Sequence, residues 1–275
     1  MQGLLSLFAD DTKLYSTIRN KSDQLAMQES LDALSKWTVD WKMQFNVSKC
    51  AVMHIGHNNP RTEYMLAGEK IKTTQMEKDV GVIIQDNLKF DQHCRKIATT
   101  CNRIIGQIRR SFTNKSPELM VMLFKTYILP HVDYCASLWN PGCKRDIAVI
   151  ESIQRRFTRI ISGLEKLSYE ERLAALDLPK LQERRRRQDL VQAWKIWNDI
   201  DKVDGKMFTR VSDHHNISTR HSLGDNFVVN KTRLNIRKNF FSNRIVNDWN
   251  LLPDHVQQAK GSVKAFKTKL DKVIL

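Results

Sequence analysis

Short apolar runs separated by turn-forming residues fill the first part of the chain, and they predict strands. The runs with strand character are 4–9, 12–18 and 49–56, with two or three shorter ones inside 64–85 around Gly68 and Gly81. Asp10 and Asp11 separate the first two runs, so the opening is expected to be a β-hairpin or a strand with its return. A helix capped by Ser22 or Asp23 should follow. Its expected buried stripe is Leu25, Leu31, Leu34, Thr38 and Trp41.

Beyond about residue 91 the apolar spacing changes to that of helices. One helix should bury Ile97, Cys101, Ile104, Ile105 and Ile108, and the next, after Pro117, should bury Leu119, Met122, Leu123 and Tyr127. Further helices are predicted over 144–161, 169–176, 180–197, 240–251 and 263–274. The segment 206–231 has little periodicity and is expected to be a flexible loop. Strands followed by helices predict an α+β fold.

The charge of the chain indicates a class of function. The 275 residues include 45 Lys+Arg against 30 Asp+Glu, a formal charge of +15, which favours a polyanionic partner such as nucleic acid over the alternative of a membrane surface. No apolar run approaches the roughly 20 residues that span a bilayer, and Met1-Gln2-Gly3 does not resemble a signal peptide. We therefore expect an intracellular protein with no membrane partner, and the nucleus and the cytoplasm both stay open.

The five cysteines are odd in number and form no C-x-x-C pair. His93-Cys94 with Cys101 is the nearest approach to a ligand cluster. Because structural zinc usually needs two tight ligand pairs, these thiols are expected to be buried or idle.

Asp10 and Asp11 are the candidate catalytic residues. Adjacent acids at a hairpin tip repel each other, and the pair lacks the Gly or Asn that tight turns prefer, so a functional reason is indicated. Nucleotidyl transfer supplies one, because two divalent cations about 4 Å apart need carboxylates on a rigid strand end. Spacing alone leaves the matter open, since a bare Asp-Asp pair is common.

A series of short motifs runs through the chain. They are Phe8-Ala9-Asp10-Asp11-Thr12-Lys13-Leu14, Leu34-Ser35-Lys36-Trp37, Trp41-Lys42-Met43-Gln44-Phe45-Asn46, Lys49-Cys50, Glu77-Lys78-Asp79-Val80-Gly81-Val82, Asn87-Leu88, Ile108-Arg109-Arg110-Ser111, Tyr127 with Pro130-His131, Trp139-Asn140-Pro141, Gln154-Arg155-Arg156 and Leu167-Ser168-Tyr169-Glu170-Glu171-Arg172-Leu173. The first resembles the Tyr/Phe-Ala-Asp-Asp box of reverse transcriptases. The whole series resembles the C-terminal part of a non-LTR (LINE-like) retrotransposon reverse transcriptase of the jockey-like and chicken-repeat-like clades, from residue 4 to at least residue 190.

The resemblance implies an architecture. Residues 1–57 would be the remnant of an incomplete polymerase palm, 58–92 primer-grip-like strands, 93–165 thumb-like helices and 166–275 a basic, mainly helical C-terminal region. RNA template and DNA primer, or an RNA/DNA hybrid, would be the partners, whereas protein partners are not indicated.

The resemblance also implies roles for single residues. Asp10 would bind catalytic Mg²⁺, and Asp11 would assist or bind the second ion. Lys49 would approach the pyrophosphate as a general acid, or else be a solvated lysine at a strand end, and Phe8 would shape the site beside the primer end. In that family a further metal-binding Asp, the fingers and an endonuclease domain precede this box, and here nine residues precede Asp10. We therefore expect no polymerase activity from the chain alone.

The helical half carries the candidate nucleic-acid-binding residues. They are Arg103, Arg109, Arg110, Lys115, Arg155, Arg156, Arg159, Arg184, Arg185, Arg186 and Arg187. They could form a groove that follows a phosphate backbone, or they could be solvated helix faces. Four consecutive arginines cannot share one face, so about two of the last four should face a ligand, and the others water or acids such as Glu183 and Asp189. The same run resembles a short nuclear-import patch.

The six tryptophans could stack on bases, but Trp at helical spacing is more often part of a core. We expect core positions for Trp37, Trp41, Trp139, Trp194, Trp197 and Trp249.

Three functions remain open at this point. The first is a truncated RNA-directed DNA polymerase, and the second is a non-catalytic nucleic-acid-binding remnant. The third is a domesticated scaffold that uses its helices for protein contacts.

Overall fold

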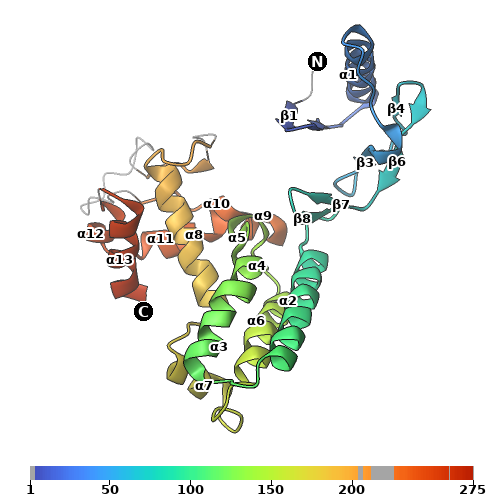
Figure 1. Cartoon of the computed structure of the whole chain (residues 1–275). Coiled ribbons are helices and arrows are strands. Elements are labelled where there is room, and N and C mark those ends of the chain that lie inside the picture. Colours follow the sequence, from blue (N-terminus) through green and yellow to red (C-terminus); the bar gives the residue numbers. More distant parts are fainter. Residues whose placement is uncertain (1–3, 204–206, 212–225, 260, 275) are drawn as a thin grey trace. The chain divides into compact units, whose positions relative to one another are not determined.

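The computed structural model describes residues 4–203, 207–211, 226–259 and 261–274. They form two compact units, Met1–Lys89 and Phe90–Leu275 (unit 1 and unit 2), and each is described by itself. The division lies near the expected change from strands to helices (Figure 1). No described helix has the length and apolar content that crossing a membrane requires.

Unit 1 contains one long helix and four two-stranded sheets. Its elements are β1 (Leu4–Phe8), β2 (Asp11–Tyr15), α1 (Lys21–Asp40), η1 (Val47–Lys49), β3 (Ala51–Met53), β4 (Met65–Leu66), β5 (Glu69–Lys70), β6 (Lys72–Thr74), β7 (Met76–Asp79) and β8 (Val82–Gln85). The strand pairs β1-β2, β4-β5 and β7-β8 are antiparallel hairpins, and β3 pairs with β6 in parallel. Gly68 and Gly81 have positive φ at the turns of two of these hairpins. The segment 64–85 contains five short strands, β4 to β8, where two or three were predicted.

The core of unit 1 is small. Tyr64, Leu66 and Ile71 are buried and pack against Met27 and Leu31 of α1. The predicted stripe on α1 is correct at Leu31, Leu34 and Thr38, which are buried or half-buried, and wrong at Leu25 and Trp41, which are exposed. The helix begins at Asn20, whose side chain accepts a hydrogen bond from the Asp23 N–H, so the predicted caps Ser22 and Asp23 lie inside it. The strand predicted over 49–56 is shorter, at β3.

Unit 2 is helical. Its elements are α2 (Asp91–Ser111), α3 (Pro117–Leu123), η2 (Phe124–Ile128), α4 (Leu129–Asp133), α5 (Ala136–Trp139), α6 (Lys144–Thr158), α7 (Tyr169–Leu176), α8 (Leu181–Trp197), α9 (Asn235–Lys238), α10 (Phe241–Arg244), α11 (Val246–Asn250), α12 (Asp254–Gln257) and α13 (Val263–Ile274). Helix α2 packs along α6, and it buries Cys101, Ile105 and Ile108 as predicted (Figure 1). The predicted helix over 240–251 is divided into α10 and α11.

A π-helical turn, η2, interrupts the helix that begins at Pro117. The Leu129 N–H donates to the Phe124 carbonyl five residues earlier, and Pro130 has no N–H with which to continue an α-helical ladder. The extra residue rotates the helix, so Phe124 and Ile128 are buried instead of Tyr127. The predicted burial of Tyr127 is therefore wrong. That of Met122, which precedes the turn, is wrong as well, since both side chains are more than half exposed.

The last part of unit 2 builds a core of aromatic rings around α8. Trp194 stacks on Phe266 at 4.9 Å between ring centroids, and Trp249 stacks on Phe227 at 5.0 Å. Trp139 is also buried and Trp197 is partly so, which confirms the expectation for these tryptophans.

Two expectations for this fold need a separate statement. Trp37 and Trp41 are 46% and 67% exposed, so the core expectation for that pair is wrong in this chain. The loop predicted over 206–231 falls largely on residues outside the described ones. Its described ends are joined by a bridge between Arg210 and Phe227.

Candidate functional site

The two candidate catalytic acids lie at the turn of the β1-β2 hairpin. Phe8 faces Asp11 in the antiparallel register, so Ala9 and Asp10 form a two-residue turn. Ala9 has a φ of +53° where such turns usually place glycine, and this strained backbone is typical of functional positions. Both carboxylates and the Phe8 ring are exposed. The turn therefore presents two oxygen ligands to solvent.

These ligands supply only part of a two-ion site. Mg²⁺ is usually held by one or two carboxylates together with waters and substrate phosphates, whereas nucleotidyl transfer needs carboxylates for two ions. Among the described residues, no group of three or more His, Cys, Asp or Glu side chains could hold a metal ion. The described part of the chain thus does not fit a complete two-metal centre, and Asp10 and Asp11 can contribute at most one side of it.

Lys49 ends the short helix η1 and is exposed. No hydrogen bond or ion pair joins it to Asp10 or Asp11 within the described residues. The hairpin is instead tied to the rest of unit 1 by Lys13, whose amine lies 2.5 Å from a carboxylate oxygen of Asp79 in β7. The contact of Lys49 with pyrophosphate stays a prediction.

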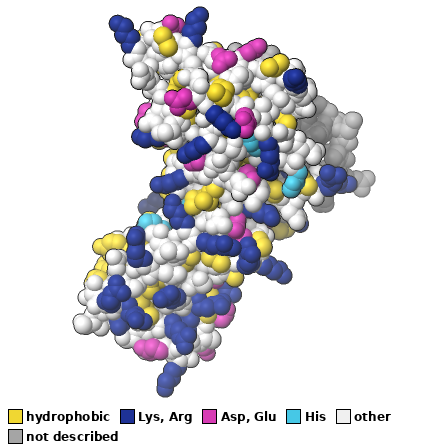
Figure 2. Space-filling view, turned by 90° about the vertical axis from the view of Figure 1, so that its right-hand side faces the viewer, with side chains coloured by type: hydrophobic (Ala, Val, Ile, Leu, Met, Phe, Trp, Pro, Cys, Tyr) yellow, Lys and Arg dark blue, Asp and Glu magenta, His cyan; other side chains and the backbone are white. Residues whose placement is uncertain are grey.

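Helices α2 and α6 carry a group of exposed arginines (the α2–α6 arginines). They are Arg103, Arg109, Arg110, Arg155, Arg156 and Arg159. Arg103 and Arg110 are seven residues apart and share one helical face, as do Arg155 and Arg159, four residues apart. Figure 2 shows lysine and arginine side chains in excess over acids on the face of unit 2 around α2.

Most of these guanidinium groups have no hydrogen-bond or ion-pair partner among the described residues. Arg155 lies over the Tyr169 ring at 4.9 Å. The others make no side-chain hydrogen bond or ion pair with any residue that the structure describes. Exposed cations without acids beside them can bind phosphates without first breaking an ion pair. Lys115, the other basic candidate of this region, is half-buried.

The run Arg184 to Arg187 is arranged differently, because each guanidinium contacts another element of unit 2. Arg184 binds Asp133 with both Nε and Nη2, Arg186 lies 2.6 Å from Asp248, and Arg187 lies 2.5 Å from Asp271. The expectation that Glu183 or Asp189 lies beside these arginines is therefore wrong for Arg184, Arg186 and Arg187.

Arg185 is 2% exposed and cannot reach a ligand in solvent, so it leaves the set of candidate nucleic-acid-binding residues. Its guanidinium donates to Asn140 Oδ1 and to the carbonyls of Val132 and Ala136, and it lies 3.8 Å from the centroid of the Trp139 ring. Burial lowers the pKa of Arg185 to about 10, and the nearby Asp189 opposes that shift. At neutral pH the group is a buried cation.

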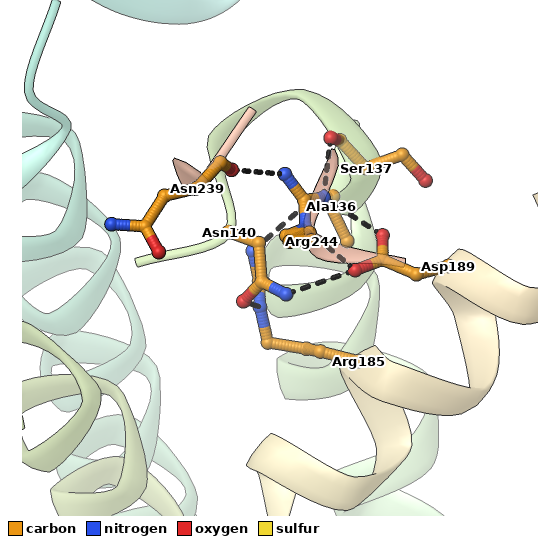
Figure 3. Close-up of polar contacts among 7 residues, drawn as sticks. All are labelled: Ala136, Ser137, Asn140, Arg185, Asp189, Asn239 and Arg244. Atoms are coloured by element: carbon orange, nitrogen blue, oxygen red, sulfur yellow. Dashed lines mark hydrogen bonds and ion pairs between the residues drawn. The ribbon is translucent and has the colours of Figure 1, made fainter. Parts of the chain in front are cut away.

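A neighbouring arginine completes this polar network (Figure 3). Arg244 donates from Nε and Nη2 to the two oxygens of Asp189, at 2.8 and 2.9 Å, and from Nη2 to the Ser137 carbonyl. Asn140 donates to the same Asp189 at 3.0 Å and so links the two arginines. The network joins α5, α8 and α10, and a buried charge that is paired and hydrogen-bonded in this way stabilises one arrangement of those helices.

The cysteine-histidine cluster is structural. Cys94 and Cys101 are fully buried, and burial raises the pKa of each thiol to about 12. Burial also lowers the pKa of His93 to about 4, and its ring packs edge-on against Trp139 at 4.6 Å. The burial of Cys94 and Cys101 confirms the expectation of buried thiols.

Comparison with known proteins identifies distant relatives. The RNA-directed DNA polymerase from mobile element jockey of Drosophila melanogaster is 25% identical over 167 residues, 58% of this chain and 18% of the relative. The probable RNA-directed DNA polymerase from transposon X-element of the same organism is 24% identical over 172 residues, 60% of this chain and 19% of the relative. The uncharacterized protein B0403.1 of Caenorhabditis elegans is 24% identical over 134 residues, 48% of this chain and 66% of the relative.

The chain is related to RNA-directed DNA polymerases of mobile elements. It spans about a fifth of the length of the polymerases it matches. No family model matches the sequence, and no solved structure matches it.

The partners of the arginine run were missed by reasoning from sequence. Asp133, Asp248 and Asp271 lie 51, 62 and 84 residues from Arg184, Arg186 and Arg187, the arginines that they bind. Local spacing contains no signal for such pairs. Sequence also gave no signal for the burial of Arg185, because its neighbours from Gln182 to Asp189 are all polar or charged.

Proposed function

We propose that the chain is part of the reverse transcriptase of a non-LTR retrotransposon and that unit 2 binds the phosphate backbone of an RNA/DNA hybrid. The α2–α6 arginines carry this proposal, because they are exposed, share helical faces and lack acidic partners among the described residues. The distant relatives, which are named as RNA-directed DNA polymerases, support the choice of ligand. In this proposal α2 to α6 act as a thumb, and the strands of unit 1 belong to an α+β palm with its primer grip.

Asp10 and Asp11 have a defined place in the same proposal. They would hold one side of a Mg²⁺ site at the hairpin turn, with Phe8 beside the primer end and Lys49 near the pyrophosphate. Bound metal would supply charge neutralisation for the transferred phosphoryl group. The residues of this chain would fix the position of the carboxylates through the strained Ala9 turn and the Lys13–Asp79 ion pair.

Salt-dependent binding of a labelled RNA/DNA hybrid tests the proposal. With the whole chain, the logarithm of the binding constant should fall linearly with the logarithm of salt concentration between about 50 and 300 mM. The double variant Arg103→Ala/Arg110→Ala removes two phosphate contacts from one face of α2, so it should flatten the slope by about 1 to 2 and weaken binding by about tenfold or more at low salt. Alanine keeps the helix, which circular dichroism checks.

The matched control is Lys195→Ala on α8, because this lysine is paired with Asp201 and lies outside the α2–α6 arginines. It should leave the salt slope unchanged. A binding constant that does not respond to salt, or a double variant that behaves like Lys195→Ala, contradicts the electrostatic surface.

A second candidate, binding without catalysis, is favoured by the incomplete set of carboxylates in the described residues. We propose that the chain alone does not extend a primer when it is given Mg²⁺ or Mn²⁺, primed RNA and dNTPs. Incorporation that is lost in Asp10→Ala would instead show that the hairpin acids complete an active site within this chain.

A further inference from the structure

A cavity of about 340 Å³ lies within unit 2 and does not involve the α2–α6 arginines. Five segments line it: the η2–α4 turn, α6, the connection before α8, α8 itself and α13. Its volume is within the range of roughly 300 to 1,000 Å³ for small-molecule sites. Phe124, Leu129 and Leu178 give it apolar walls, and charged side chains of α8 form another part of its lining.

One buried side chain in the lining lacks a partner. Gln154 of α6 is 1% exposed, and its Nε2 donates to the Pro179 carbonyl at 2.9 Å. That bond fixes the orientation of the amide, so the other end is the oxygen Oε1. This buried acceptor has no hydrogen-bond donor among the described residues. Native proteins seldom leave such a group unsatisfied. The oxygen itself is closed to solvent, so a ligand N–H or O–H in the cavity would reach it after a rotation of the Gln154 side chain.

Some N–H donors of the residues that line the cavity have no partner among the described residues. Arg184 and Arg187 use Nε and Nη2 on Asp133 and Asp271, so Nη1 of each has no partner among the described residues. Lys125 is exposed and unpaired within the described chain. Carboxylates of the lining, such as Asp177, accompany these cations. A lining with both donors and acceptors suits a ligand that carries both kinds of group better than it suits a bare anion.

The backbone beside the cavity is unusual as well. Phe124 and Lys125 belong to the π-helical turn η2, and such turns occur frequently at functional sites. The turn thus supplies two neighbouring residues of the lining, Phe124 and Lys125.

We propose that this cavity binds a single unstacked nucleotide. Its base would lie among the apolar walls and donate an N–H to Gln154 Oε1, and its phosphate would accept from Lys125 and from Nη1 of Arg184. The proposal rests on the proposed nucleic-acid function and adds a second site to it. The same chemistry is offered by a free nucleoside monophosphate and by a nucleotide turned out of a single-stranded RNA.

Calorimetric titration of the whole chain with cytidine 5′-monophosphate, and separately with ribose 5-phosphate, tests the base contact. Cytidine 5′-monophosphate should bind at least about tenfold more tightly, because ribose 5-phosphate has the phosphate but no base to reach Gln154. Equal binding of the two compounds overturns the proposal. A cytidine hexanucleotide then identifies the source: competition at equal or lower concentration assigns the site to RNA, and failure to compete assigns it to the free nucleotide.

Two variants localise the site. Lys125→Ala should weaken binding of both compounds by about tenfold, since it removes a charge-assisted contact from an exposed position that folding does not need. The matched control is Lys166→Ala, an exposed lysine outside the lining, which should bind as the parent does. Leu178→Trp should fill the cavity, so cytidine 5′-monophosphate should then bind no more tightly than ribose 5-phosphate. Unchanged affinities in both Lys125→Ala and Leu178→Trp overturn the proposal.

The two sites can fail separately. Arg103→Ala/Arg110→Ala should retain binding of cytidine 5′-monophosphate while it loses hybrid binding, and Leu178→Trp should do the reverse. If both ligands are lost in the α2 double variant, the cavity is not an independent site and the further inference fails.

Discussion

Arg185 and Arg186 are neighbours in the sequence, but the surroundings of their guanidinium groups differ. Arg185→Ala removes the donors of two buried carbonyls and leaves a void against Trp139, so it should lower the free energy of unfolding by about 3 to 5 kcal/mol. Arg186 is 48% exposed at its ion pair with Asp248, so Arg186→Ala should cost less than about 1 kcal/mol. Urea unfolding followed by tryptophan fluorescence measures both. Equal losses would show that burial does not distinguish the two arginines.

His93 gives unit 2 a dependence on pH. Its pKa is lowered from 6.5 to about 4, first by burial and then by the charges of Lys96 and Arg185. In the unfolded chain His93 binds a proton below pH 6.5, and in the folded chain it does so only below about pH 4. The contribution of neutral His93 to the free energy of unfolding is therefore complete above pH 6.5. It should be lost as the pH falls to about 4, by about 3 kcal/mol.

The variant His93→Gln isolates that contribution from the carboxylates, which also titrate in acid. The difference in free energy of unfolding between the parent and the variant should be largest at pH 7 to 8 and should decrease toward pH 4. A difference that stays constant with pH would exclude His93 as the titrating group.

Residue-level features were predictable from sequence where the cause is local. The turn near Asp10 and Asp11 follows from apolar runs on both sides, and the structure places Asp10 in the turn and Asp11 at the first residue of β2. The partners of Arg184, Arg186 and Arg187 come from α4, α11 and α13, so they depend on tertiary packing that the spacing of residues does not encode.

Helix α7 shows the same rule at the scale of elements. Its predicted range, 169–176, is the observed one, and a capping box explains why: Ser168 Oγ accepts from the Glu171 N–H, and the Glu171 carboxylate accepts from the Ser168 N–H. Hydrogen bonds from the Ser168 hydroxyl and from the Ser168 N–H hold the pKa of the Glu171 carboxyl below its usual range. Helix α13 was also predicted at its observed bounds.

Ser168→Ala removes one half of this capping box. It should lower the free energy of unfolding by about 1 kcal/mol, because the first turn of α7 then has an N–H without a partner. Ser152→Ala is the control, since Ser152 is exposed on α6 and its hydroxyl only donates back to the Val149 carbonyl. That control should be neutral or slightly stabilising. A Ser168→Ala chain as stable as the control would mean that the cap contributes nothing.

The wrong predictions of buried helix residues have a tertiary or a backbone cause that the helical period does not contain. Tyr127 was expected in the buried stripe, but the π-helical turn shifts the register after Phe124. Trp41 was expected in the same stripe as Leu31, but it follows Asp40, the last residue of α1, and is exposed, whereas the sheet residues pack against Met27 and Leu31. The period gives the existence of a helix and does not determine how much of its apolar stripe other elements cover.

At the scale of the whole molecule, the two units differ in the size of their cores. Among the described residues, the buried hydrophobic side chains of unit 1 are Tyr64, Leu66, Ile71 and Val82. Unit 2 buries several aromatic rings in addition to its aliphatic residues, and it has the Arg244–Asp189 network between its helices. Since stability comes mainly from buried apolar area, unit 2 should be the more stable of the two.

Limited digestion with trypsin tests this difference. Lys89 is exposed at the end of unit 1, so cleavage there should release a resistant fragment that begins at Phe90 and retains α2 through α8, while peptides of unit 1 disappear first. In urea, a first transition of unit 1 should appear in circular dichroism. The buried Trp139, Trp194 and Trp249 should report only the second transition, because they belong to unit 2. Earlier loss of α2–α8 peptides, or a single transition seen by both probes, would mean that the small core of unit 1 is stabilised through unit 2 and that the units do not unfold independently.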